Sequence, residues 1–223
     1  MKKGIFILLL LFTMTTLKAQ TYKYEIGGGV GIGFYMGDAN PSKPFRKPGA
    51  AFDLAFRWNI NYRWALKCGL STATVSGNTN GLKGYFPNNA EFSFKRQLID
   101  LGVQAEFNFF NYGMGQSYLD TKRFSPYIVA GFGITAVPKK GDSFYSVNVP
   151  LGFGVKYKAG KRVNMMLEFT MRKTLGDKLD GKDLDDPYNI ESSAFKNTDW
   201  YSYTMFSVTY DFGAKKKICN NIN

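Results

Sequence analysis

The amino-acid sequence predicts an all-β fold, an eight-stranded antiparallel up-and-down transmembrane β-barrel. Three observations predict it: eight segments alternate apolar and polar residues, the connections between them alternate between long and short, and a short apolar run follows two lysines at the start of the chain. Alternation at period two indicates strands with one face in an apolar and one in a polar environment. An even number of strands returns the chain to the side on which it began.

The eight segments are clearest where large apolar residues recur at every second position. In the second segment, Phe52, Leu54 and Phe56 alternate with Asp53 and Ala55. A tilted strand needs about 9–11 residues to cross a bilayer, and we expect each segment to do so. The segments cover residues 24–36, 52–60, 64–71, 99–109, 127–134, 147–157, 163–172 and 205–212.

The connections predict the orientation of the barrel. Long connections span residues 38–48, 77–92, 138–144 and 176–198, whereas tight turns fall near Asn61 and at 159–160, and the turn at 111–123 is longer than expected. Long loops outside and short turns in the periplasm are typical of outer-membrane barrels. We therefore expect an outer-membrane location with both termini in the periplasm.

The ends of the chain predict three parts. Lys2 and Lys3 precede an apolar run from Ile5 to Phe12, which is too short to span a bilayer, and Ala19 stands at a suitable cleavage position. We expect a signal peptide at residues 1–19, a barrel at 20–213 and a short basic periplasmic tail at 214–223. The net charge of +12 falls to about +9 when the three lysines of the signal peptide are removed.

A soluble barrel of the lipocalin type also alternates, but it turns its apolar face inward. Two features favour the membrane barrel: the polar face carries many charges at mid-strand, and aromatic residues gather near the strand ends, where membrane barrels have their girdles. The girdle residues are Tyr22, Tyr24, Trp58, Trp64, Phe109, Tyr157, Trp200 and Phe212.

The charges of the polar face are expected to form a paired network, because an eight-stranded barrel has room inside only for its own side chains. A proton or ion path is the alternative. Loss of Arg172 is expected to leave Glu168 or its neighbours unpaired, and the glycines of the first strand are expected to make room for long charged side chains from the opposite wall. The network comprises Glu25, Asp53, Arg57, Lys67, Asp100, Glu106, Lys156, Glu168, Arg172 and Asp211.

The composition argues against catalysis, cofactors and metal binding. The sequence has no histidine, which excludes Ser-His triads and nearly every zinc site, and its two cysteines are unrelated in position. The acidic segment 177–187 does not have the spacing of a calcium loop. Secretion argues against a nucleic-acid partner, and no small-molecule substrate is indicated. The excess of basic residues could bind lipid A phosphates or an acidic protein partner, or it could simply form a solvated surface.

Several motifs resemble the PorG-like outer-membrane barrels of the type IX secretion system of Bacteroidota. They are residues 24–29 with 34–38, residues 124–133, residues 149–157, and Glu168-x-x-x-Arg172-Lys173-Thr174 followed by Asp177 and Tyr188. The resemblance spans residues 24 to about 212 and departs from the family at Lys178, where an aromatic residue is frequent.

The resemblance implies a non-catalytic barrel that anchors periplasmic secretion lipoproteins or ring components to the outer membrane, with outer-membrane lipid around it. A stand-alone surface barrel of the OmpA or OmpW type, acting through its outer loops as adhesin or stress protein, is the alternative, and a lipid-modifying enzyme is a third. The implied partner contacts lie in the turns 111–123 and 158–162 and in the tail: Lys122, Arg123, Lys158, Lys161, Arg162, Lys215, Lys216 and Lys217.

Overall fold

A computed structural model describes residues 22–36, 48–78, 93–113, 120–138, 144–175 and 200–214 of the chain. These residues form eight strands joined by turns. The strands are β1 (Tyr22–Met36), β2 (Gly49–Asn59), β3 (Trp64–Asn78), β4 (Ser93–Asn108), β5 (Phe124–Val137), β6 (Phe144–Lys158), β7 (Val163–Thr174) and β8 (Trp200–Ala214). The predicted signal peptide lies outside the described residues, as does the predicted tail beyond Ala214.

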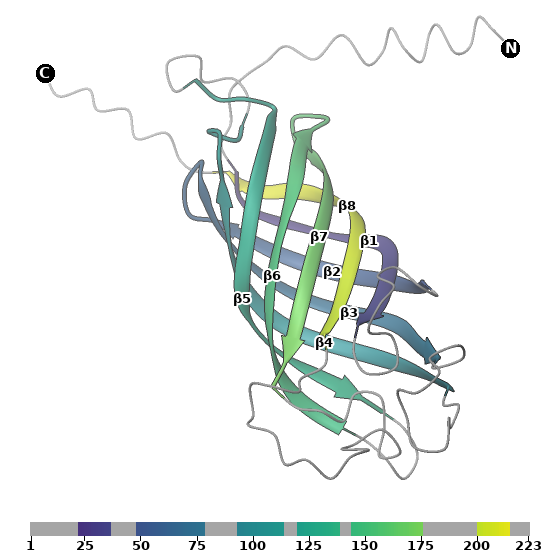
Figure 1. Ribbon diagram of the computed structural model, residues 1–223. Helices are drawn as coiled ribbons and strands as arrows, with labels where there is room; N and C mark the ends of the chain where they lie inside the picture. Colours follow the sequence, from purple (N-terminus) through teal and green to yellow (C-terminus); the bar gives the residue numbers. More distant parts are fainter. Residues whose placement is uncertain are drawn as a thin grey trace, which may run out of the picture.

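The strands close into a barrel in which each pairs with its neighbour along the chain and β8 pairs with β1 (Figure 1). All pairings are antiparallel, and the closing pair runs from Tyr22 opposite Ala214 to Met36 opposite Trp200. The predicted fold class, an eight-stranded antiparallel up-and-down barrel, is therefore confirmed. The strands extend past the predicted segments, most of all at the end of β3 and at the starts of β4 and β8. Toward the loops, apolar residues such as Val75 and Leu98 face inward and polar residues such as Gln97 face outward, so the pattern of the predicted segments no longer applies there.

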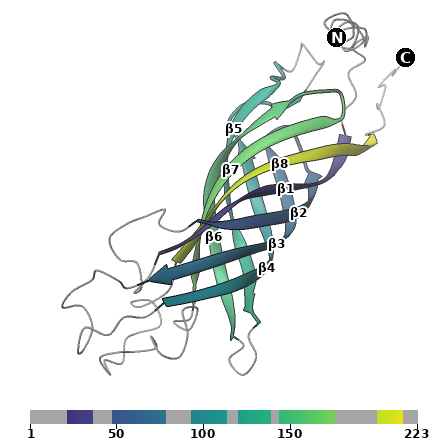
Figure 2. The same cartoon turned by 90° about the vertical axis from the view of Figure 1, so that its right-hand side faces the viewer.

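The first residue of β1 and the last of β8 lie at the same end of the barrel as the turns between β2 and β3, β4 and β5, and β6 and β7 (Figures 1 and 2). We call this the turn end, and the opposite end the loop end. The β2–β3 turn is tight because the Asn61 side chain accepts hydrogen bonds from the backbone of Arg63 at 2.8 Å and Trp64 at 2.7 Å. In the β6–β7 turn, Gly160 donates to the carbonyl of Val163.

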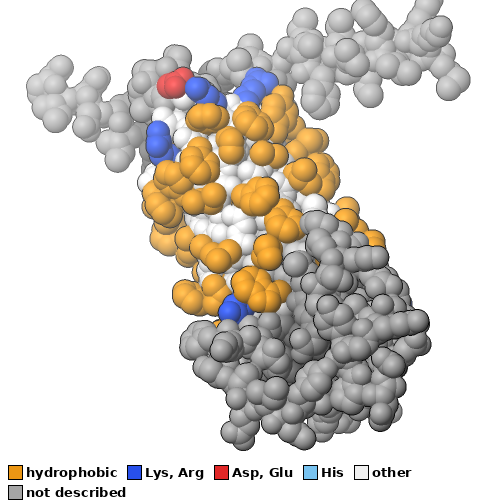
Figure 3. Space-filling model, viewed as in Figure 1, with side chains coloured by type: hydrophobic (Ala, Val, Ile, Leu, Met, Phe, Trp, Pro, Cys, Tyr) orange, Lys and Arg blue, Asp and Glu red, His pale blue; other side chains and the backbone are white. Residues whose placement is uncertain are grey.

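The outward face of the wall is apolar and the inward face is polar. Leu54 is 65% exposed and Phe132 is 72% exposed, whereas Arg57 and Glu106 are buried. Figure 3 shows hydrophobic side chains covering the wall in view, with lysines and arginines gathered toward its ends. This arrangement inverts that of a soluble barrel and is the one expected in lipid.

Aromatic side chains form part of a girdle at the turn end. The ring of Tyr24 lies 5.7 Å from that of Phe56 and 5.6 Å from that of Phe212, and Trp64 lies 4.9 Å from Phe107. The ammonium of Lys23 sits 5.4 Å from the centre of the Tyr24 ring. Aromatic rings paired with cations suit the boundary between hydrocarbon and headgroups.

The glycines of β1 allow β1 and β8 to approach closely. A Cβ atom added at Gly27 would lie 2.1 Å from the carbonyl oxygen of Val208, and one at Gly31 would lie 2.0 Å from that of Thr204. The expectation that these glycines make room for long charged side chains is therefore wrong at both positions, because the β8 backbone occupies the space. At Gly29 the added atom would lie 2.4 Å from the carboxylate of Asp53 and 2.4 Å from the hydroxyl of Ser207, which are short side chains of the two paired strands and not long ones from the opposite wall.

We predict that Gly31→Ala destabilises the barrel by about 1–3 kcal/mol or more, because the added methyl group forces β1 and β8 apart. The matched control is Gly69→Ala, where the nearest atom to the new Cβ lies 3.7 Å away. Urea unfolding of the refolded proteins in lipid vesicles, followed by the heat-dependent shift of the folded band on gels, measures both. Equal stability of the two variants would contradict this account of the β1–β8 seam.

Candidate functional site

The inward charges are joined around Glu106, whose carboxylate is fully buried. It accepts a hydrogen bond from Arg57 Nε at 2.9 Å, forms an ion pair with Lys156, and lies 3.8 Å from Lys67 Nζ. The three cations come from β2, β3 and β6, so this carboxylate of β4 joins strands on both sides of it and across the lumen. A buried carboxylate without such partners would carry a desolvation cost of several kcal/mol.

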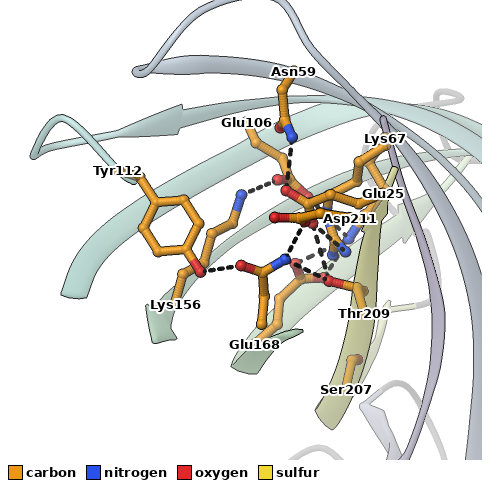
Figure 4. A network of polar contacts seen from close by, with 12 residues as sticks. Glu25, Asn59, Lys67, Glu106, Tyr112, Lys156, Glu168, Ser207, Thr209 and Asp211 are labelled. Carbon is orange, nitrogen blue, oxygen red and sulfur yellow. Dashed lines mark hydrogen bonds and ion pairs between the residues drawn. The ribbon is translucent and has the colours of Figure 1, made fainter. Parts of the chain in front are cut away.

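Two further carboxylates extend this network (Figure 4). Glu168 accepts hydrogen bonds from Lys67 at 2.6 Å and 2.9 Å and from the phenol of Tyr127 at 2.7 Å. Glu25 accepts from Asn59 at 2.8 Å and lies 3.9 Å from Arg57. The network therefore crosses the lumen and includes side chains from every strand from β1 to β7.

A second cluster lies nearer the loop end, around Asp100. Its carboxylate forms an ion pair with Arg172 at 3.3 Å and accepts hydrogen bonds from Thr135 at 2.7 Å, Tyr201 at 2.5 Å and the phenol of Tyr203. Every donor comes from another strand, so this carboxylate also braces the wall.

The sequence prediction named Glu168 or its neighbours as the groups that Arg172 neutralises. The ion pair of Arg172 instead joins it to Asp100, and Glu168 is neutralised by Lys67. The reason is geometric. Glu168 and Arg172 are four residues apart on β7, which is about 13 Å along a strand. Each side chain therefore reaches a partner on another strand more easily than it reaches the other.

Asp53 occupies the least enclosed position of the predicted network. Its carboxylate accepts a hydrogen bond from Ser207 at 3.2 Å, and its side chain is half-buried. The structure thus places all ten predicted network residues on the inward face, nine of them buried.

Two further cations, Arg96 and Lys158, face inward and are buried, although the alternation pattern did not predict them as members of the network. With them, six acidic and six basic side chains face inward among the described residues, where the sequence had suggested six and four. Lys158 was predicted as a periplasmic partner contact, but it is buried inside the barrel, where its ammonium forms an ion pair with Asp211 and donates to Asn164 at 3.0 Å. The signal was present, because Lys158 continues the inward alternation of Lys156.

The β4–β5 turn closes the turn end of the lumen through Tyr112, which pairs with Lys122 in an isolated bridge. The Tyr112 phenol donates to Asn164 at 2.8 Å, and the Lys158 ammonium lies 5.6 Å from its ring centre. Burial, followed by the negative charge of Glu25, raises the pKa of this phenol, which keeps it a neutral donor. The unexpected length of this turn therefore has a structural use.

At the loop end of the lumen, apolar side chains pack over the Asp100 cluster. The packed residues are Tyr35, Ala51, Ala73, Val75, Leu98, Val137, Tyr201, Tyr203 and Met205. Between this apolar cluster and Tyr112 the lumen is filled by paired charges. This arrangement agrees with the expectation that an eight-stranded barrel has room inside only for its own side chains.

The remaining predicted contacts lie at the turn end. Lys122 and Arg123 are exposed, Lys161 is half-buried, and the tail lysines lie outside the described residues. Arg162 is exposed but held in place: its Nε donates to the phenol of Tyr22 at 3.0 Å and its Nη1 to that of Tyr210 at 2.8 Å. The described turns thus present a basic surface, with Asp120 as an acidic residue beside Lys122.

The chemistry available in the described residues is limited. They hold no group of three His, Cys, Asp or Glu side chains arranged to bind a metal ion. Within the same ranges, no helix has the length and apolar character needed to cross a membrane. The side-chain network supports bracing and surface contact as roles of this molecule.

The chain belongs to the family described as a domain of unknown function, DUF6089, whose model matches residues 2–221. No curated protein matches it. Neisserial surface protein A (NspA) is similar in structure, with 11% sequence identity, a TM-score of 0.52, and coverage of 85% of this chain and 97% of that one. The outer membrane protein OprG from Pseudomonas aeruginosa is 13% identical with a TM-score of 0.47, covering 88% of this chain and 98% of its own. The likeness to NspA shows a shared fold.

We predict that Glu106→Gln lowers the free energy of unfolding by about 3–5 kcal/mol, because it leaves three buried cations around a neutral side chain. The control is Asp120→Asn, which breaks an exposed ion pair of 3.8 Å to Lys122 and is expected to change stability by less than about 0.5 kcal/mol. Asparagine also tolerates the positive φ of 45° at this position. Urea unfolding in vesicles measures both, and equal effects would show that Glu106 does not join the walls.

Proposed function

We propose that this DUF6089 family member is an outer-membrane β-barrel that acts as a non-catalytic component of the type IX protein secretion apparatus, linking periplasmic secretion lipoproteins to the outer membrane. The observation that carries the proposal is the contrast between the lumen, whose charges are paired with one another, and the turn end, whose cations are exposed. Paired charges fill the lumen, while Lys122, Arg123 and Arg162 are exposed where β1 begins and β8 ends.

The membrane part of the proposal is supported by the wall of the barrel. Its outward face is apolar on every strand, and closure by β1 and β8 leaves no open sheet edge. Both properties are required of strands that cross a bilayer. The outer membrane is the compartment that suits such a barrel, and NspA, a surface protein, shares the fold.

The non-catalytic part is supported by what the lumen contains. Its carboxylates form ion pairs and hydrogen bonds with cations and phenols from other strands, so their role is to stabilise the fold. The sequence has no histidine to serve as a base.

The secretion part is supported by the resemblance to PorG-like barrels and by the basic turn end. A basic surface attracts acidic partners and speeds their association. In the proposed orientation that surface faces the periplasm, where secretion lipoproteins lie. The motif of the resemblance that contains Glu168 and Arg172 supplies two members of the lumen network, so in this chain these two residues have a structural role.

A stand-alone surface barrel is the second candidate, and the fold shared with NspA favours it. In that case the loop end would carry the function and the turn end would be free of protein partners. The two candidates therefore differ in which end of the barrel binds other proteins.

We predict that the double variant Lys122→Glu with Arg123→Glu lowers the recovery of periplasmic lipoproteins at least fivefold in affinity purification from outer membranes under mild detergent, because it reverses charge at the basic turn end. Arg162 is left intact because it is bound to Tyr22 and Tyr210. The readout is quantitative mass spectrometry, with equal amounts of folded barrel in each sample.

The matched control is Lys173→Glu, which reverses a charge on β7 near the loop end. A chain that ends at Ala214 separates the tail from the turns as the contact. If the unaltered protein recovers no periplasmic lipoprotein, the secretion role is rejected and the surface barrel is the better proposal. If the protein is missing from the outer-membrane fraction, the membrane location itself is rejected.

A further inference from the structure

A groove of about 720 Å³ crosses the outside of the wall formed by β8, β1, β2, β3 and β4. Figure 2 faces this wall and shows the five strands side by side. The groove is bordered by outward apolar side chains such as Phe206, Val30, Phe52 and Ile99. It lies outside the charged lumen.

The register of the strands explains its shape. Its floor is the backbone of the paired residues Gly29, Asp53 and Ser71, which occupy inward-facing positions. Outward side chains on the rows to either side form its walls. On one wall Gly28 stands between Val208 and Leu54 and contributes no side chain, so the groove widens at β1.

The dimensions suit a single hydrocarbon chain. Two rows that are two residues apart are separated by about 7 Å, and five strands span four spacings of about 4.8 Å, or about 19 Å. One leaflet of a bilayer has a hydrocarbon depth of about 15 Å. The groove therefore has the length of one acyl chain that lies inclined in one leaflet.

The groove becomes polar at its β4 end. Gln97 borders it there and donates to the hydroxyl of Thr72 at 3.2 Å. The next outward residue of β4 toward the loop end is Lys95, which is exposed. An apolar channel, then an amide, then a cation is the order of groups that complements an acyl tail, its carbonyl and a phosphate.

We infer that this groove holds one acyl chain of a phosphorylated membrane lipid in the leaflet at the loop end, with its phosphate beside Lys95. In the proposed orientation that leaflet is the outer one, and the lipid is lipid A. The inference rests on the membrane location in the proposed function but not on the role in secretion.

Native mass spectrometry of the full chain with bisphosphorylated lipid A tests the acyl-chain site. Val30→Trp places a large side chain in the groove and is expected to weaken lipid A binding at least fivefold. Val147→Trp is the matched control, because Val147 is an exposed valine on β6 in the opposite part of the wall. The heat-dependent band shift confirms that both variants fold.

The headgroup contact has its own pair of variants. Lys95→Gln is expected to weaken lipid A binding about fivefold, the effect typical of one cation near an anionic surface. Lys173→Gln, which removes a loop-end cation from the other wall, is expected to leave binding unchanged. Lipid A without phosphates is expected to bind the unaltered protein and Lys95→Gln alike.

Three outcomes would overturn the inference. The first is equal lipid A binding by the unaltered protein and Val30→Trp. The second is binding of phosphatidylglycerol as tight as that of lipid A, which would point to any anionic lipid. The third is a dimer in lipid nanodiscs that Val30→Trp dissociates, which would assign the groove to a second copy of the chain. None of these results bears on the secretion role, which the lipoprotein recovery tests separately.

Discussion

The closing pair of strands is the constraint on which the rest of the structure depends. A strand in hydrocarbon has no water to satisfy its backbone, so the sheet must close on itself, and β1 must reach β8 along its whole length. The glycines at 27 and 31 meet this demand by letting the two backbones approach. Closure with eight strands then leaves a narrow lumen, which must be filled by side chains.

The apolar residues of each strand face the lipid, so the alternate positions, which face the lumen, carry the polar and charged side chains. A charge in such a space costs several kcal/mol unless an opposite charge and hydrogen bonds accompany it. Glu106 and Asp100 each meet this condition by collecting donors from several strands, and their contacts with Arg57, Lys156 and Tyr201 join strands that are not adjacent in the sheet. The polar core thereby takes the place that hydrophobic packing has in a soluble barrel.

The sequence was sufficient for the fold because alternation at period two is a local property that every strand repeats. It also placed the inward charges, since the same alternation decides which face each residue occupies. The sequence did not predict features that depend on residues far apart in the chain. Arg172 pairs across the lumen with Asp100, and no spacing within one strand announces that partner. Lys158 was assigned to a turn because strand ends are the least certain boundaries, and Tyr112 sits in an irregular turn whose path depends on the lumen it closes.

The glycines of β1 also affect the outer surface of the barrel. Gly28 and Gly29 lie in the stretch where β1 is pressed between β2 and β8, and side chains there would meet neighbouring atoms at less than 3 Å. Gly28 faces outward and contributes no side chain between Val208 and Leu54, so the outer face of the wall is open at β1. The groove on the lipid side thus lies across the strand that closes the barrel. Gln97 borders the β4 end of the groove and Lys95 is the next outward residue of β4, so the groove is apolar at β8 and polar groups follow at β4.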